Sequence, residues 1–127
     1  MLFAHDSQKP VLLVDDDCEV RDSMTRVLAR AGYAVAAASD GADAMEQLDG
    51  GLTPCVILLD LMMPVKDGYA FRREQLAKPH LATIPTFAIS ASAPLLERAA
   101  QLGFTGIVKK PLQLQKLREL IDSCAPA

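Results

Sequence analysis

Five short apolar runs, separated by longer amphipathic stretches, limit the folds open to this chain more than any other feature of its sequence. The runs occupy residues 11–14, 35–38, 55–59, 86–89 and 106–108. Most of them are continuously apolar rather than alternating, which is typical of strands that are buried on both faces of a parallel sheet. The run at 35–38 is rich in alanine, a poor strand former, so we expect either an edge strand or no strand there.

Stretches with helical periodicity follow these runs. Apolar side chains recur at intervals of three and four residues and predict five helices, over about residues 20–31, 40–48, 68–77, 94–102 and 111–121. The apolar face of the third helix is not defined by this pattern, because Tyr69, Phe71 and Leu76 do not share one stripe. The alternation of strand and helix predicts an α/β fold, a doubly wound parallel sheet with right-handed crossovers and helices on both faces.

The composition narrows the class of protein. A length of 127 residues suits one domain, predicted to span 1–127 with a core over about residues 10–123 and short tails. Lysine and arginine number 13 against 16 aspartate and glutamate, which argues against direct binding to nucleic acid. The three cysteines and two histidines are too widely spaced to predict a disulfide framework or a zinc site. No apolar run is long enough to cross a membrane and none resembles a signal peptide, so we expect a cytoplasmic protein without a membrane partner.

Polar side chains end four of the five predicted strands. In strand order they are Asp15, Asp16 and Asp17, then Asp60, then Ser90, and finally Lys109 and Lys110. Because the carboxyl ends of parallel strands lie at the same edge of a sheet, we expect these side chains to converge in one cleft. Taken singly, each of these residues is commonly found in a turn, at the surface or as a helix cap. Asp17 in particular suits an N-cap. Their coincidence at four strand ends favours a functional site.

The predicted cleft has the chemistry of a magnesium-dependent phosphoryl site. Carboxylates without histidine or thiolate neighbours suit a hard ion, and Mg²⁺ binds one or two carboxylates while keeping waters for a phosphate. Crowded carboxylates raise one another's pKa unless a cation neutralises them. A carboxylate can also act as a nucleophile to form an aspartyl phosphate, and a lysine can pair with phosphoryl oxygens.

Four segments together resemble the receiver domain of two-component response regulators. They are Val11-Leu-Leu-Val-Asp-Asp16, Leu59-Asp60-Leu-Met-Met-Pro64-Val-Lys-Asp67-Gly68, Ala88-Ile-Ser90-Ala91 and Lys110-Pro111. The resemblance covers about residues 10–123, and the combination is far more specific than any one segment. It implies a flavodoxin-like (βα)5 fold with strand order 2-1-3-4-5 and a cis peptide bond before Pro111.

The resemblance also implies the roles of the acidic residues. By this resemblance Asp60 is the phosphoacceptor. Asp15 and Asp16 are the acidic pair that holds Mg²⁺, together with Asp60 and the backbone carbonyl of Met62. Mg²⁺ is the one cofactor that the resemblance implies.

The remaining two residues of the predicted cleft resemble the family's switch. Ser90 matches the switch hydroxyl, and Lys110 matches the lysine that contacts the phosphoryl group, because it directly precedes Pro111. The family often has an aromatic residue two or three positions before this lysine, where this sequence has Ile107. We therefore expect the switch to run through Ser90 and Lys110 while Ile107 stays in place, since a β-branched side chain resists a large rotation.

The function implied is a phosphorylation-dependent signalling domain. It would accept a phosphoryl group from a histidine kinase or a histidine phosphotransfer protein and then change its contacts with a downstream protein. It would not be an enzyme beyond its own phosphotransfer and autodephosphorylation. Because Met1 lies close to the first predicted strand, we expect a stand-alone response regulator or a natural N-terminus rather than a domain cut out of the middle of a chain.

Two other interpretations remain open at this point. Asp15-x-Asp17 after an apolar run resembles the motif of haloacid-dehalogenase-type phosphatases, with Asp15 as nucleophile. Against it, Glu19 stands where that family has threonine or valine, and Asp60 is left unexplained. The other interpretation is a degenerate receiver that serves as a binding module, although such members normally lack the phosphoacceptor, the acidic pair or the lysine.

Overall fold

The computed structural model describes residues 9–62 and 67–124 and contains one parallel sheet of five strands. The strands are β1 (Val11–Val14), β2 (Val35–Ala38), β3 (Val56–Asp60), β4 (Thr86–Ser90) and β5 (Gly106–Lys109). They are hydrogen-bonded in the order β2-β1-β3-β4-β5. The doubly wound, flavodoxin-like fold expected from the sequence is confirmed.

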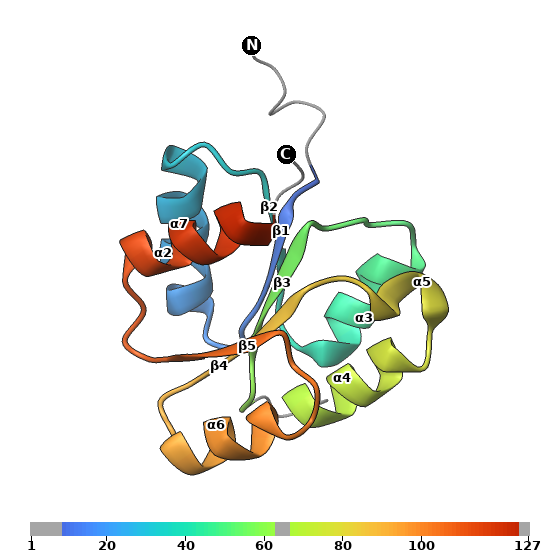
Figure 1. Ribbon diagram of the computed structural model, residues 1–127. Coiled ribbons are helices and arrows are strands. Elements are labelled where there is room, and N and C mark those ends of the chain that lie inside the picture. Colours follow the sequence, from blue (N-terminus) through green and yellow to red (C-terminus); the bar gives the residue numbers. More distant parts are fainter. Residues whose placement is uncertain (1–8, 63–66, 125–127) are drawn as a thin grey trace.

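Helices cover both faces of this sheet (Figure 1). They are α2 (Cys18–Arg30), α3 (Gly41–Asp49), α4 (Gly68–Leu76), α5 (Pro79–Ala82), α6 (Ala93–Ala100) and α7 (Leu114–Cys124). Figure 1 shows α2 and α7 together on one face and α3, α4 and α5 on the other, while α6 lies beside β4 and β5. Each helix within the described residues is too short or too polar to cross a membrane.

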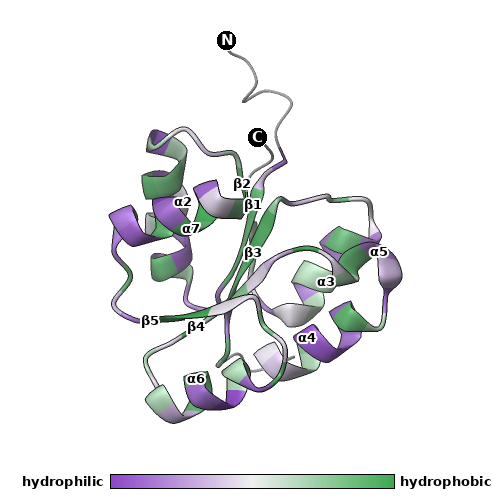
Figure 2. Ribbon diagram, viewed as in Figure 1, coloured by the Kyte–Doolittle hydropathy of each residue, from purple (hydrophilic) through white to green (hydrophobic). Residues whose placement is uncertain are grey.

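The core follows from the alternation of side chains along the strands. Leu12, Val14, Ile57 and Leu59 pack with α3 and α4 on one face of the sheet. The residues between them face the opposite way and pack with α2 and α7, namely Val11, Leu13, Val56 and Leu58. The hydropathy colouring shows the same division, with apolar strands at the centre and polar outer faces on the helices (Figure 2). Burial on both faces explains why these strands are continuously apolar.

The alanine-rich run is a true edge strand. β2 pairs with β1 over its whole length, from Val11 opposite Val35 to Val14 opposite Ala38. Only one of its edges is paired, and its side chains are mostly partly exposed. Hydrogen bonding to β1 therefore overrides the low strand propensity of alanine.

Two helix predictions were wrong in detail. The chain does break at Lys78 and Pro79 as expected, but it then forms one further helical turn, α5, which was not predicted. Proline suits the first position of such a turn, and the carbonyl of Lys78 accepts hydrogen bonds from Leu81 and Ala82 at 2.9 Å each. The last helix begins at Leu114 rather than at Pro111, after a cis peptide bond between Lys110 and Pro111.

The buried face of α4 is partly polar, which explains why hydropathy did not define it. Arg72 and Gln75 are buried together with Phe71, whereas Leu76 is exposed. The Gln75 side chain accepts hydrogen bonds from Arg72 at 2.8 Å and from the Thr86 hydroxyl at 3.1 Å. Buried polar side chains that bond to one another in this way can occupy a core position where a sequence pattern predicts apolar residues.

Candidate functional site

The sheet places the four predicted strand ends side by side. β1, β3, β4 and β5 are consecutive neighbours, and all of them run in the same direction. Asp15 directly follows β1, Asp60 and Ser90 are the last residues of β3 and β4, and Lys110 directly follows β5. Residues 95 positions apart in the sequence therefore reach the same edge of the sheet.

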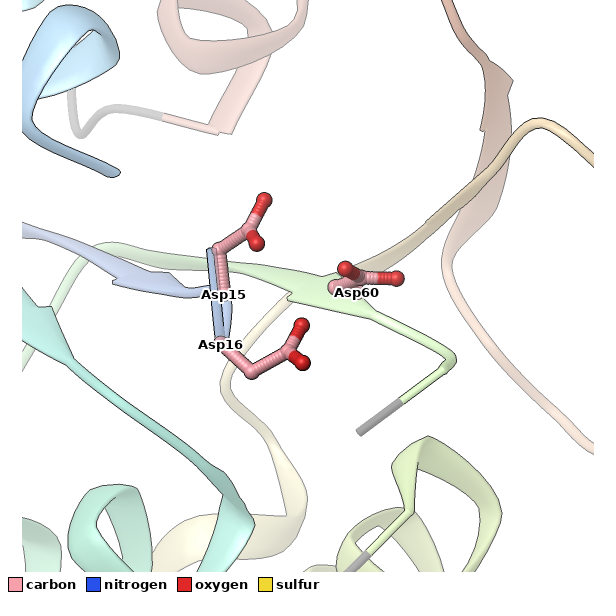
Figure 3. A group of neighbouring side chains, drawn as sticks. All are labelled: Asp15, Asp16 and Asp60. Carbon is pink, nitrogen blue, oxygen red and sulfur yellow. The ribbon is translucent and has the colours of Figure 1, made fainter. Parts of the chain in front are cut away.

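Three carboxylates meet at this edge and form what we call the acid group, Asp15, Asp16 and Asp60. Each of them offers an oxygen atom, and these oxygens all lie within 4.8 Å of one another (Figure 3). Asp15 and Asp60 are buried, with 4% and 7% of their surface exposed, whereas Asp16 is exposed. The acid group is thus open to solvent through Asp16.

The ammonium group of Lys110 lies against the two buried carboxylates. Lys110 Nζ is 3.5 Å from Asp60 Oδ2 and 3.7 Å from Asp15 Oδ2. The neighbouring Lys109 is the last residue of β5, and its side chain points to solvent. Of the two lysines, the structure places Lys110 beside the acid group.

Opposing influences act on the pKa of Asp60. Removal from water raises the pKa of the Asp60 carboxyl, and the charges of Asp15 and Asp16 raise it further. The backbone N–H of Met62, which donates to Asp60 Oδ1 at 3.0 Å, and the charge of Lys110 lower this pKa. The net direction is upward. Crowding by acids was expected to raise it, but burial is the larger cause.

Backbone contacts hold the start of the site in place. The Asp17 N–H donates to Asp15 Oδ1 at 2.9 Å, and Asp17 caps α2 by accepting from Glu19 at 3.0 Å and Val20 at 3.3 Å, as predicted for an N-cap. Arg21 Nη1 donates to the Asp15 carbonyl at 2.8 Å. Arg21 was not predicted to belong to the site, since nothing in its spacing distinguishes it from an ordinary charged residue on a helix.

Ser90 is buried and lies one residue beyond Ile89, the β4 residue that pairs with Asp60. Its hydroxyl oxygen accepts a hydrogen bond from the Ser92 N–H at 3.0 Å, and its carbonyl accepts from the Lys110 N–H at 3.0 Å. The Ser90 side chain is therefore linked to the loop before α6, and its backbone is linked to the lysine.

The loop after Asp60 is only partly described. Met63 and Pro64 of the resembling segment lie outside the described residues. The side chain of Met62 is exposed, and its backbone carbonyl stays a predicted metal ligand. On the far side of the loop Asp67 caps α4, since its Oδ1 accepts from the Ala70 N–H at 2.8 Å.

Ile107 is partly exposed. It lies on β5 opposite Ala88, and 43% of its surface is exposed. That this side chain stays in place during the switch remains a prediction.

Comparison with protein families decides between the interpretations of this arrangement. Residues 11–122 match the family model of the response regulator receiver domain. The chain belongs to this family. It is a receiver domain of two-component signalling, and neither the phosphatase nor the degenerate-module interpretation is favoured.

The curated relatives that this receiver domain matches are about twice as long. Transcriptional regulatory protein GltR of Pseudomonas aeruginosa is 33% identical over 111 residues, which are 86% of this chain and 46% of GltR. Response regulator MprA of Mycobacterium ulcerans is 35% identical over 109 residues, 84% of this chain and 46% of MprA. The chain thus spans about half the length of these relatives.

Solved receiver structures share the fold along nearly the whole chain. Chemotaxis protein CheY4 of Vibrio cholerae is 26% identical with a TM-score of 0.83, over 93% of this chain and 99% of CheY4. The receiver domain of sensor histidine kinase PA1611 from Pseudomonas aeruginosa is 27% identical with a TM-score of 0.83, over 92% of this chain and 97% of that one. The PA1611 structure contains a magnesium ion coordinated in its active-site cleft.

Proposed function

We propose that Asp60 accepts the phosphoryl group in this receiver domain. The observation that carries the proposal is the position of its carboxylate, which ends the central strand β3 with Lys110 Nζ at 3.5 Å and two further carboxylates beside it. No other carboxylate of the acid group belongs to a strand, because Asp15 and Asp16 follow β1. A carboxylate fixed in this way can attack a phosphorus atom in line.

The acid group fits a magnesium ion. Its ligand atoms are all oxygens, and they lie within 4.8 Å of one another. Among residues 9–62 and 67–124, these three carboxylates face one ammonium group, that of Lys110. Asp15, Asp16 and Asp60 would hold the ion with the backbone carbonyl of Met62. When bound, Mg²⁺ supplies positive charge that stabilises the equatorial phosphoryl oxygens in the transition state.

The residues of the chain divide the reaction between them. An oxygen of Asp60 forms a bond to phosphorus as the bond from phosphorus to the histidine nitrogen of the donor breaks, and the imidazole departs with that electron pair. Lys110 contacts the transferred oxygens as a point charge. Ser90 turns its hydroxyl from Ser92 towards the new phosphoryl group, which moves the loop before α6.

The donor that fits this reaction is the phosphohistidine of a sensor kinase or a histidine phosphotransfer protein. The acidic balance of the chain supports a protein as the downstream partner rather than nucleic acid. The domain would catalyse only its own phosphorylation and hydrolysis.

Labelling with a small phosphodonor tests the assignment. The protein is incubated with acetyl phosphate and Mg²⁺, and intact mass is expected to rise by one phosphoryl group. Reduction of the acyl phosphate with borohydride, followed by peptide mapping, is expected to mark Asp60. The Asp60→Asn variant should take up no label, while Glu97→Gln, which removes an exposed carboxylate on α6, should be labelled like wild type.

The same map separates the alternatives. A label on Asp15 would favour the phosphatase mechanism, and no label on the wild-type protein would favour a binding module. Either result would refute the assignment of Asp60.

A further inference from the structure

The first residue of α4 rests directly on the end of the phosphoacceptor strand. The Gly68 N–H donates to the Leu61 carbonyl at 3.2 Å. A Cβ atom at Gly68 would lie 2.9 Å from Leu61 Cα and 3.2 Å from the Asp60 carbonyl oxygen, closer than side chains normally pack. A displacement of Asp60 or Leu61 is therefore transmitted to α4 without an intervening side chain.

The next residue, Tyr69, connects α4 to α6. Its hydroxyl donates to the Leu95 carbonyl at 2.8 Å, and Arg98 Cζ lies 4.9 Å from the centre of its ring. The ring packs in an apolar cluster with Leu61, Leu96 and two alanines. Burial raises the pKa of Tyr69, so its hydroxyl stays a donor. The sequence pattern did not show this contact, because Tyr69 and Leu95 are 26 residues apart.

Leu95 is held from two directions. Its N–H is capped by Ser92 Oγ at 3.4 Å, and the Ser92 N–H donates to the switch hydroxyl of Ser90 at 3.0 Å. Its carbonyl is held by Tyr69. Ser90, acting through Ser92, and Tyr69 of α4 are thus both connected to Leu95, in the first turn of α6.

A second contact from α4 reaches the other end of α6. Arg72 Nη2 donates to the Gly103 carbonyl at 2.6 Å, three residues beyond the end of this helix. Arg72 also lies over the Phe104 ring, with Cζ 5.5 Å from the ring centre. α4 is therefore hydrogen-bonded to the chain near both ends of α6. Tyr69 binds near the N-terminal end, next to the loop that Ser90 is proposed to move.

We propose that Tyr69 is a positioning residue of the phosphorylation switch, whose hydroxyl holds the first turn of α6 in its unphosphorylated position. The inference rests on the proposed role of Asp60. When the hydrogen bond between the Ser92 N–H and the Ser90 hydroxyl breaks, the hydrogen bond from Tyr69 to Leu95 still resists the movement of the first turn of α6. Its removal should favour the switched conformation about two- to tenfold, the effect of one hydrogen bond on an equilibrium.

Titration with beryllofluoride, a phosphoryl mimic, in the presence of Mg²⁺ tests the inference by NMR. A ligand that selects a minor conformation binds more tightly in proportion to the population of that conformation. The Tyr69→Phe variant keeps the ring and loses the hydroxyl, so half-saturation should need about two- to tenfold less beryllofluoride. Without the mimic, its amide signals over residues 95–100 should lie part of the way from the free to the saturated positions of wild type.

Two further variants keep the result interpretable. Arg98→Gln removes the charge over the Tyr69 ring from an exposed position and should shift half-saturation in the same direction by a smaller factor. Tyr33→Phe removes the protein's other tyrosine hydroxyl, which donates to Asp122 at 2.6 Å, and should leave half-saturation unchanged.

Unchanged or weaker beryllofluoride binding by Tyr69→Phe, with a normal wild-type response, would overturn the role of Tyr69 and leave Asp60 as the phosphoacceptor. A wild-type protein that neither responds to the mimic nor gains a phosphoryl group would instead overturn the proposed function.

Discussion

Replacement of Asp60 by asparagine should stabilise the fold in the absence of metal. The change keeps the shape of the side chain and the oxygen that accepts from the Met62 N–H at 3.0 Å. It removes the negative charge of a residue that has only 7% of its surface exposed. The acid group is expected to hold this charge at a cost in folding free energy, because burial and two like charges raise the pKa of Asp60.

The separations in the site set the magnitude. Each of the two repulsions within 4.8 Å is worth at least about 0.9 kcal/mol with the dielectric constant of water and about 3.5 kcal/mol at an effective value of 20. The attraction to Lys110 at 3.5 Å offsets about 1.2 to 4.7 kcal/mol on the same scale. A net gain of about 0.5 to 2 kcal/mol remains before the desolvation of Asp60 is included. For a chain of 127 residues, each kcal/mol corresponds to about 4 °C in Tm.

Thermal unfolding in a chelator is the assay, with Glu97→Gln as the control carboxylate-to-amide change on an exposed position of α6. Because the pKa of Asp60 is raised on folding, folding favours the protonated carboxyl over the ionised one. The stability that the protonated carboxyl contributes is present below its unfolded pKa, near 4, and is lost as pH rises through the folded value. The advantage of Asp60→Asn should therefore grow as pH rises from 4 through the folded pKa and disappear below pH 4. A variant that is equal to or less stable than wild type at pH 7 in chelator would refute this account.

Three further predictions concern the metal, the core and the edge of the sheet. Mg²⁺ at a hundredfold excess over its Kd should stabilise wild type by about 2.7 kcal/mol in thermal unfolding. Asp16→Asn should lose most of this stabilisation, and the control Cys18→Ser should lose none of it. Equal stabilisation of all three proteins would contradict the metal site. Gln75→Leu should cost about 1 to 3 kcal/mol in urea unfolding, because it leaves the buried Arg72 Nη1 without its acceptor, whereas Thr86 and Leu81 each keep a hydrogen bond to Ile84. A neutral result would show that Arg72 finds another partner. Gly106→Ala should cost about 1 to 3 kcal/mol in the same assay, because the new Cβ would lie 2.8 Å from the Phe87 ring; an unchanged stability would mean that the ring moves freely.

Local sequence patterns were sufficient for the layers of the fold. Continuous apolar runs predicted buried parallel strands, and the recurrence of apolar side chains predicted the helices, because both patterns depend on residues near one another in the chain. The site could be placed for a related reason. Parallel strands share one carboxyl edge, so Asp15, Asp60 and a lysine at the end of the last strand were expected to converge once the alternation of strand and helix was recognised. The choice of Lys110 over Lys109 came from the resemblance to receiver domains, because Lys110 precedes Pro111.

Local patterns failed wherever a side chain was paired with a distant element. Hydropathy could not define the buried face of α4, because Gln75 is accepted in the core only through partners on α5, β4 and the same helix. It gave no sign of the hydrogen bond that joins Tyr69 to Leu95, or of the one that joins Arg21 to the Asp15 carbonyl.

The sequence alone therefore determined the five strands, the helices other than α5, and the strand ends that form the functional edge of the sheet. Only the tertiary structure decided which helix holds α6 and which polar groups are buried. The physical reason is that periodicity reports the environment of a residue averaged along one element. A buried hydrogen bond is instead stable only where two particular groups, brought together by the fold, replace the water that each has lost.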